Sequence, residues 1–124
     1  MAGQDPTERD PKAAQDSFDA FKDLVTRFPG SKYASDARLR MQYLVNALAQ
    51  YEIHVASYYQ RRGAHISAVN RAKNVLTLYP NSTSAKEALS IMVKGYEALG
   101  MRELRDDAQR VLDLNFPQQS TAKK

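Results

Sequence analysis

The sequence predicts an all-helical protein of about five α-helices that fold back on one another as a stack of hairpins. Apolar residues recur at the three- and four-residue spacing of helices along most of the chain. The five Gly and five Pro residues lie mostly between these segments, where they end helices. A frame of Tyr, Gly and Pro also occurs twice, 37 positions apart, which indicates a repeated helical unit.

The composition narrows the class of protein. A chain of 124 residues with 43% hydrophobic residues fits one domain with a modest core and is too apolar to be disordered. No Cys is present, which excludes disulfides, thiolate catalysis and cysteine metal sites. The longest apolar runs are far shorter than a membrane-spanning helix.

The chain divides into three regions. We expect residues 1–9 to be a disordered N-terminal segment, residues 10–117 to be the helical domain, and residues 118–124 to be a disordered tail. Met1-Ala2-Gly3 is interpreted as an artificial start, so we expect the natural N-terminus to be missing.

The first helix is predicted to begin at Asp10 and Pro11, because Asp caps free backbone N–H groups and Pro suits the first helical position. Pro29 and Gly30 end this helix. Its apolar face has alternating spacings of four and three, and consists of Ala14, Phe18, Phe21, Val25 and Phe28.

The second helix is predicted over about 31–62, an uninterrupted helix of about 30 residues. A second apolar edge, formed by Leu39, Val45 and Tyr59, indicates partners on both flanks. We therefore expect this helix to serve two successive hairpins, with the first helix paired to its N-terminal half. Its main stripe consists of Ala37, Met41, Leu44, Leu48, Tyr51, Val55 and Tyr58.

Three shorter helices are predicted over about 64–79, 84–99 and 102–114. Ser84 and Glu87 match a capping box at the start of the middle one. The residues expected to point inward are Ala68, Val69, Ala72, Val75, Leu76, Tyr79, Ala85, Ala88, Leu89, Met92, Val93, Tyr96, Leu104, Ala108, Val111 and Leu112.

The repeated frame consists of Tyr59, Gly63 and Pro80 and, 37 positions later, Tyr96, Gly100 and Pro117. In each copy the Tyr would fill the space between two helices, the Gly would allow the turn, and the Pro would end the second helix. The pattern resembles the tetratricopeptide repeat, although the second copy has Arg105 where an Ala is expected. The small residues of the first copy are Val55-Ala56, Ala68 and Ala72.

Nothing in the sequence predicts catalysis or a cofactor. His54 and His65 have no His or Cys at a ligating spacing, so we interpret them as surface residues and expect no metal site. No nucleotide-binding or nucleophile motif occurs.

Four polar residues are candidates for binding a partner protein. Arg61 and Arg62 end the long helix, where they could reach a partner carboxylate or serve as stabilising charges at the helix C-terminus. Asn70 and Arg71 interrupt the apolar pattern of the next helix, where they could border the same surface or form a solvated face.

Several stretches resemble the BamD family, the tetratricopeptide lipoproteins of the machinery that inserts β-barrels into the bacterial outer membrane. The resemblance covers about residues 9–117, corresponds to the C-terminal half of that family, and lacks its lipid-bearing Cys and N-terminal repeats. It is carried by residues 48–64, Val69-Asn70-Arg71, Tyr79-Pro80, Arg9-Asp10-Pro11, Arg27-Phe28-Pro29 and Ser31-Lys32-Tyr33.

The resemblance implies a non-catalytic scaffold at the periplasmic face of the outer membrane, attached to the membrane only through the missing anchor. It implies docking on the POTRA domains of BamA and contacts with BamC-like and BamE-like accessory lipoproteins. The Arg of the family motif Tyr-Tyr-x-x-Arg-Gly-Ala falls on Arg62 and is the implied BamA contact.

Two other functions stay open. The chain could be another tetratricopeptide adaptor of the bacterial envelope. A net charge of +4 also allows a basic nucleic-acid-binding domain, but the 18 cationic residues are scattered among 14 acidic ones. We therefore expect no nucleic-acid partner.

Overall fold

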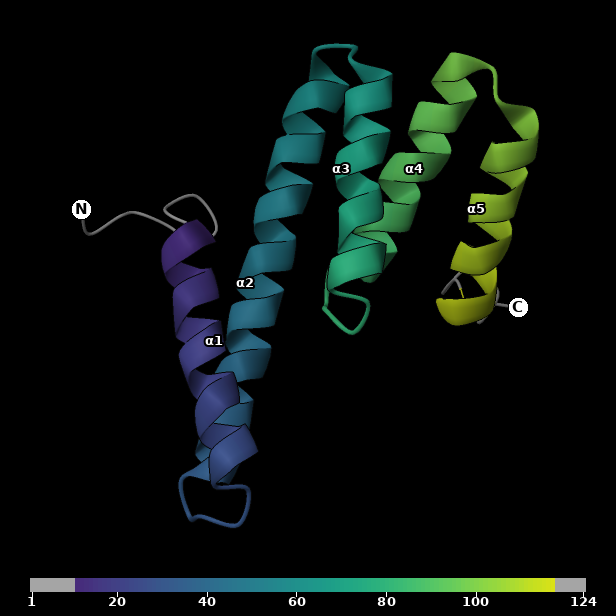
Figure 1. Ribbon diagram of the computed structural model, residues 1–124. Coiled ribbons are helices and arrows are strands. Elements are labelled where there is room, and N and C mark those ends of the chain that lie inside the picture. The colour runs from purple at the N-terminus through teal and green to yellow at the C-terminus, as the bar shows by residue number, and fades with distance from the viewer. Residues whose placement is uncertain (1–10, 118–124) are drawn as a thin grey trace.

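The computed structural model describes residues 11–117, and every element of regular structure in that range is an α-helix. Consecutive helices run antiparallel and lie side by side (Figure 1). The predicted all-helical stack of hairpins is therefore confirmed, whereas Asp10, residues 1–9 and residues 118–124 lie outside the described range. The helices are α1 (Pro11–Arg27), α2 (Ala34–Arg61), α3 (His65–Leu78), α4 (Ala85–Leu99) and α5 (Arg102–Asn115).

The long helix α2 joins two parts of the stack. It has 28 residues, close to the predicted 30, and is about 42 Å long at 1.5 Å per residue. In Figure 1, α1 lies along the N-terminal half of α2 and α3 lies along its C-terminal half. Helix α2 also contacts α4, so it packs on more than one flank, and Tyr59 of its second apolar edge contacts the core.

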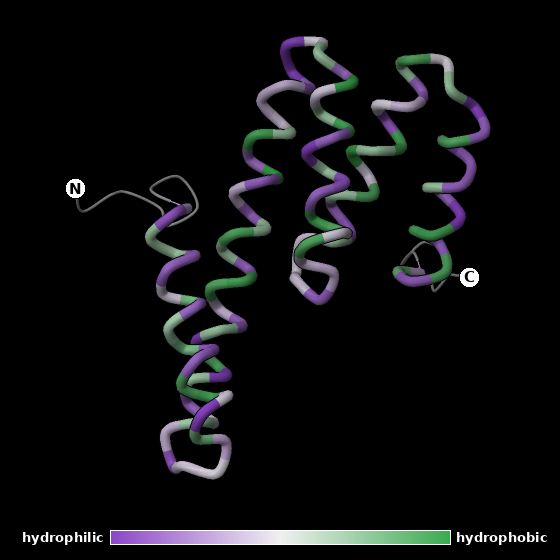
Figure 2. Tube along the Cα trace, viewed as in Figure 1, coloured by the Kyte–Doolittle hydropathy of each residue, from purple (hydrophilic) through white to green (hydrophobic). Residues whose placement is uncertain are grey.

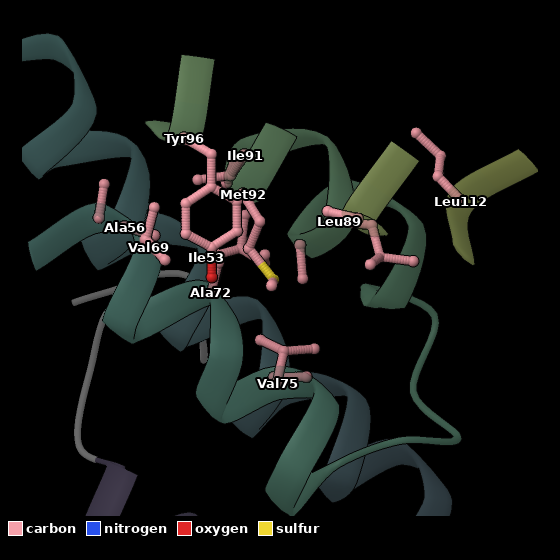
Figure 3. Close-up of a cluster of buried hydrophobic side chains, with 14 residues drawn as sticks. Ile53, Ala56, Val69, Ala72, Val75, Leu89, Ile91, Met92, Tyr96 and Leu112 are labelled. Carbon is pink, nitrogen blue, oxygen red and sulfur yellow. The ribbon is translucent and has the colours of Figure 1, made fainter. Parts of the chain in front are cut away.

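The core lies where α2, α3 and α4 meet and continues to α5. Many of its members are alanines that are less than 1% exposed, and small side chains let helix backbones approach closely. The ring of Tyr96 points from α4 into this cluster, near Ile53, Val69 and Met92 (Figure 3). Tyr59 packs against the same cluster, so both frame tyrosines lie between helices as predicted.

Some predicted core positions are wrong. Phe28, Leu39 and Tyr58 are 55%, 72% and 48% exposed, and Leu104 and Val111 are 46% and 43% exposed. Because α1 pairs with only the N-terminal half of α2, the stripe loses its partner helix before it reaches Tyr58. The sequence stripe also omits Ala49 and Ile53, which α2 buries against α3 and α4.

The frame glycines have the backbone conformation that the repeat predicts. Gly63 has φ +80° and Gly100 has φ +75°, a left-handed conformation that other residues rarely adopt. This turn lets the Ala64 N–H donate to the Tyr59 carbonyl and the Met101 N–H donate to the Tyr96 carbonyl, both at 2.9 Å. The two turns are thus closed by the same hydrogen bond.

The predicted capping box at Ser84 is not formed. No side chain caps the start of α4, and the buried Ser84 hydroxyl instead donates to Gln50 Oε1 at 3.2 Å. The hydroxyl therefore ties the start of α4 to α2, because a tertiary partner lies within reach of it.

Hydrophobic and hydrophilic residues alternate along the helices (Figure 2). None of the helices within residues 11–117 combines the length and hydropathy needed to cross a membrane. The apolar residues instead form the faces with which the helices pack on one another.

Candidate partner-binding site

The C-terminal end of α2 carries two exposed arginines. Arg61 is the last residue of the helix and Arg62 is its C-cap. The Arg62 guanidinium lies 5.4 Å from the centre of the Tyr58 ring, close enough for a cation–π contact. Tyr58 packs edge to face on Tyr59, whose ring contacts the core. These contacts hold Arg62 at the turn between α2 and α3.

A second cationic group lies between α2 and α3. Arg71 Nη1 donates to Glu52 Oε1 at 3.1 Å, and Asn74 Nδ2 donates to the same oxygen at 3.4 Å. The Glu52 side chain is only 14% exposed, whereas that of Arg71 is 39% exposed. We call Glu52, Arg71 and Asn74 the Glu52 cluster. Glu52 therefore binds one N–H group of a guanidinium whose side chain remains partly exposed.

Tyr79 lies next to this cluster. Desolvation by burial raises the pKa of its hydroxyl above the usual 10.0, and the negative charge of Glu52 raises it further. Tyr79 therefore stays neutral in the folded chain to a higher pH than an exposed tyrosine would.

Asn70 lies on a different side of α3 from Arg71. It is exposed and lines a groove between α3 and α5 together with Lys73. The four candidate residues therefore do not form one compact site: Arg61 and Arg62 lie at the hairpin end, Arg71 faces α2, and Asn70 faces α5.

Glu52 and Asn74 were not predicted as site residues, and Tyr58 was predicted to be buried. A signal for Glu52 was available, because a helical hairpin closed at Gly63 brings the C-terminal half of α2, which contains Glu52, beside α3. An acid in one helix and a base in the other, at opposite positions, could have been paired on that ground. For Tyr58 the available signal was its i,i+4 spacing to Arg62 within the Tyr-Tyr-x-x-Arg motif, but its position in the apolar stripe predicts burial.

The acidic side chains of the described residues are dispersed, and several of them pair with basic side chains. Between Pro11 and Pro117, no three His, Asp or Glu side chains gather closely enough to hold a metal ion. Many cations are neutralised locally by Asp or Glu at 2.9–3.3 Å, namely Lys12, Arg27, Arg40, Arg71, Arg105 and Arg110.

Stacked helical hairpins with a repeated Tyr–Gly–Pro frame define a tetratricopeptide-like scaffold protein. A model of the YfiO family, described as outer membrane lipoprotein, matches residues 1–111. The chain belongs to this family.

Curated relatives carry the name outer membrane protein assembly factor BamD. The chain is 48% identical to the one from Neisseria meningitidis strain Z2491 over 117 residues, 94% of this chain and 44% of that protein. It is 40% identical to the one from Xylella fastidiosa strain 9a5c over 91% of this chain and 39% of that protein. It is 37% identical to the one from Vibrio cholerae strain N16961, over 90% of this chain and 46% of that protein.

These matches confirm the resemblance to the BamD family. The chain spans less than half the length of these relatives.

Proposed function

We propose that this chain is a non-catalytic docking platform within an outer-membrane protein assembly factor, located at the periplasmic face of the outer membrane. Its partners are a POTRA domain of BamA and the accessory lipoproteins of the BamC and BamE type. Family membership and the name of the relatives support the assembly role. The rigid stack supports the platform, because a preformed surface loses little entropy when it binds.

The observation that carries the docking proposal is the way α2 holds Arg71. A guanidinium has five N–H donors, and Glu52 occupies one side of this one. The donors on the exposed side are oriented before a partner arrives, and they can bind a carboxylate on a POTRA domain in a bidentate manner. Arg71 is therefore the candidate whose geometry favours docking most.

Arg62 is the second candidate, because the family motif assigns it the BamA contact and Tyr58 supports its guanidinium. Arg61 extends the proposed surface at the hairpin end, whereas Asn70 faces α5 and lies outside it. Arg62 is fully on the surface, where an ion pair contributes less than in a partly desolvated position.

Calorimetric titration with isolated BamA POTRA domains tests this proposal. Arg71→Gln keeps an amide donor for Glu52 but loses the charge, and we expect it to weaken binding at least about tenfold. Arg62→Glu should weaken binding by a smaller factor. The matched control is Arg38→Glu, an exposed arginine on the N-terminal half of α2.

Circular dichroism must show unchanged helicity for all three variants. Unchanged affinity in both Arg71→Gln and Arg62→Glu would exclude the arginine surface. An equal loss in Arg38→Glu would show that only net charge matters.

A further inference from the structure

A groove runs between α3 and α5 over α4, on a different side of α3 from the Glu52 cluster. We call it the α3–α5 groove, and its volume is about 220 Å³. Its apolar lining comes from three helices and the turn before α5: Ile66, Val69, Tyr96, Leu99, Met101 and Leu104.

The groove has a buried floor and exposed walls. Val69 and Tyr96 are 4% and 5% exposed, and both belong to the core. Ile66, Met101 and Leu104 are 59%, 41% and 46% exposed. Three large apolar side chains around one hollow are more than the scattered apolar residues of an ordinary surface.

Repeat stacking does not account for this exposure. Helices α3 and α5 both pack on α4, but not extensively on each other, so the groove lies between hairpins that are already stacked.

The edge of the groove is positively charged. Lys73 and Asn70 follow Ile66 along one stripe of α3, and no acidic side chain lines the groove. Lys73 makes no ion pair within residues 11–117. The surface therefore complements an apolar segment that carries a negative charge beside its apolar residues.

The chain's own terminal segments do not have this composition. Residues 118–124 contain two lysines, no acid and one alanine as their single hydrophobic residue. Residues 1–10 contain acids but no large apolar residue beyond Met1. Neither segment supplies both an apolar ridge and a neighbouring acid.

We propose that the α3–α5 groove binds an acidic amphipathic helix of a partner protein. Two apolar side chains one turn apart enter between Ile66 and Leu104, and an acidic side chain about one turn further on pairs with Lys73. A helix fits because the groove lies between two helices and offers no strand edge to an extended segment. This site is separate from the arginine surface, and neither proposal depends on the other.

The test measures fluorescence polarisation of a labelled, helix-stabilised peptide of about four turns, with Leu at i and i+4 and Glu at i+7. We expect saturable binding to the full 124-residue chain. Leu104→Glu and Ile66→Glu should each weaken it at least about tenfold. The matched control is Leu114→Glu, an α5 leucine that is 75% exposed and lies outside the groove.

A charge swap tests the role of Lys73. Lys73→Glu should weaken binding about threefold, and a peptide with Lys in place of that Glu should regain the lost affinity on this variant. Lys86→Glu, on the exposed side of α4, is the control and should leave both peptides unaffected.

The proposal is overturned if the peptide does not saturate, or if Leu114→Glu weakens binding as much as Leu104→Glu does. Failure of the charge swap would overturn the acidic character of the partner. Sedimentation velocity of the free chain completes the test. A dimer that Leu104→Glu dissociates would assign the groove to a second copy of this chain and overturn the proposed partner.

Discussion

The α2–α3 hairpin and the α4–α5 hairpin can be compared position by position, because a shift of 37 residues superimposes their frames. The turn of each is closed by the same hydrogen bond from the residue after Gly to the frame Tyr, at 2.9 Å. The second helices also end alike, with Tyr79 N–H donating to Val75 at 2.9 Å and Phe116 N–H donating to Leu112 at 2.8 Å. The main chain of the two hairpins is therefore built in the same way.

The side chains between the helices differ. The positions of Glu52, Arg71 and Asn74 in the first hairpin correspond to Leu89, Ala108 and Val111 in the second. The first set makes an ion pair and a hydrogen bond, whereas Leu89 and Ala108 belong to the apolar core. The same main-chain frame is therefore compatible with either polar or apolar side chains between its two helices.

The outer positions differ as well. Tyr58 and Arg62 in the first hairpin correspond to Gly95 and Leu99 in the second. Tyr58 is half-exposed and holds Arg62, whereas Gly95 is buried against α3. A neighbouring hairpin therefore decides whether a repeat position becomes a packing contact or an exposed surface.

The largest expected effect comes from exchanging the residues at this outer position. A Cβ on Gly95 would overlap the Val69 Cγ2 methyl, so Gly95→Tyr should force α3 and α4 apart and lower the free energy of unfolding by about 3 kcal/mol. Urea unfolding monitored by circular dichroism measures this loss in the free energy of unfolding.

The reverse control is Tyr58→Ala, which should change the stability by about 0.5 kcal/mol because the site is half-exposed. If Gly95→Tyr were as mild as this control, α3 and α4 would not pack as closely as described.

The next largest loss of stability is expected when a polar residue between the helices of the first hairpin is replaced by its apolar counterpart from the second hairpin. Glu52→Leu leaves Arg71 and Asn74 without their acceptor and should lower the stability by about 1–2 kcal/mol. This is below the about 3–5 kcal/mol of a fully buried pair, because Arg71 is partly exposed.

The triple variant Glu52→Leu, Arg71→Ala and Asn74→Val reproduces the apolar filling. Its stability should return to within about 1 kcal/mol of the wild type, while binding to POTRA domains is lost. Thermal unfolding and titration separate the two outcomes. A triple variant less stable than Glu52→Leu alone would mean that the two hairpins are not interchangeable.

The frame itself should respond equally in both hairpins. Gly63→Ala and Gly100→Ala should each lower the stability by about 1 kcal/mol, because the added Cβ meets open space and only the positive φ is unfavourable. The control is Gly30→Ala, which has neither a positive φ nor a close neighbour. Unequal losses at Gly63 and Gly100 in chemical denaturation would contradict the shared frame.

The smallest expected effect concerns Tyr79, which corresponds to Phe116. The pKa of Tyr79 is higher in the folded chain than in the unfolded chain. The contribution of neutral Tyr79 to the free energy of unfolding is therefore complete below the unfolded pKa of about 10, and it is lost as the pH rises through the higher folded pKa. Tyr79→Phe should therefore flatten the alkaline decline of the urea midpoint. Tyr43→Phe, at an exposed tyrosine, should leave the slope of that decline unchanged.

Much of the fold was predictable because its signals are local. The helix-breaking turns at Gly63 and Gly100 and the apolar spacing of each helix predict the five helices to within a few residues. The errors lie where burial depends on distant neighbours: Tyr58 and Leu104 fit apolar stripes yet face open surfaces, and Ser84 bonds to Gln50 across the fold. The candidate arginines were predictable as residues, but not their grouping.

The sequence by itself determined the helices, their turns and the two-copy frame, because spacing, glycine conformation and proline act within a few residues of the chain. Only the tertiary structure decided which positions are buried, that Glu52 orients Arg71, and that Ile66 and Leu104 face one groove. These depend on how helices pack, and packing joins residues whose separation along the chain carries no periodic signal.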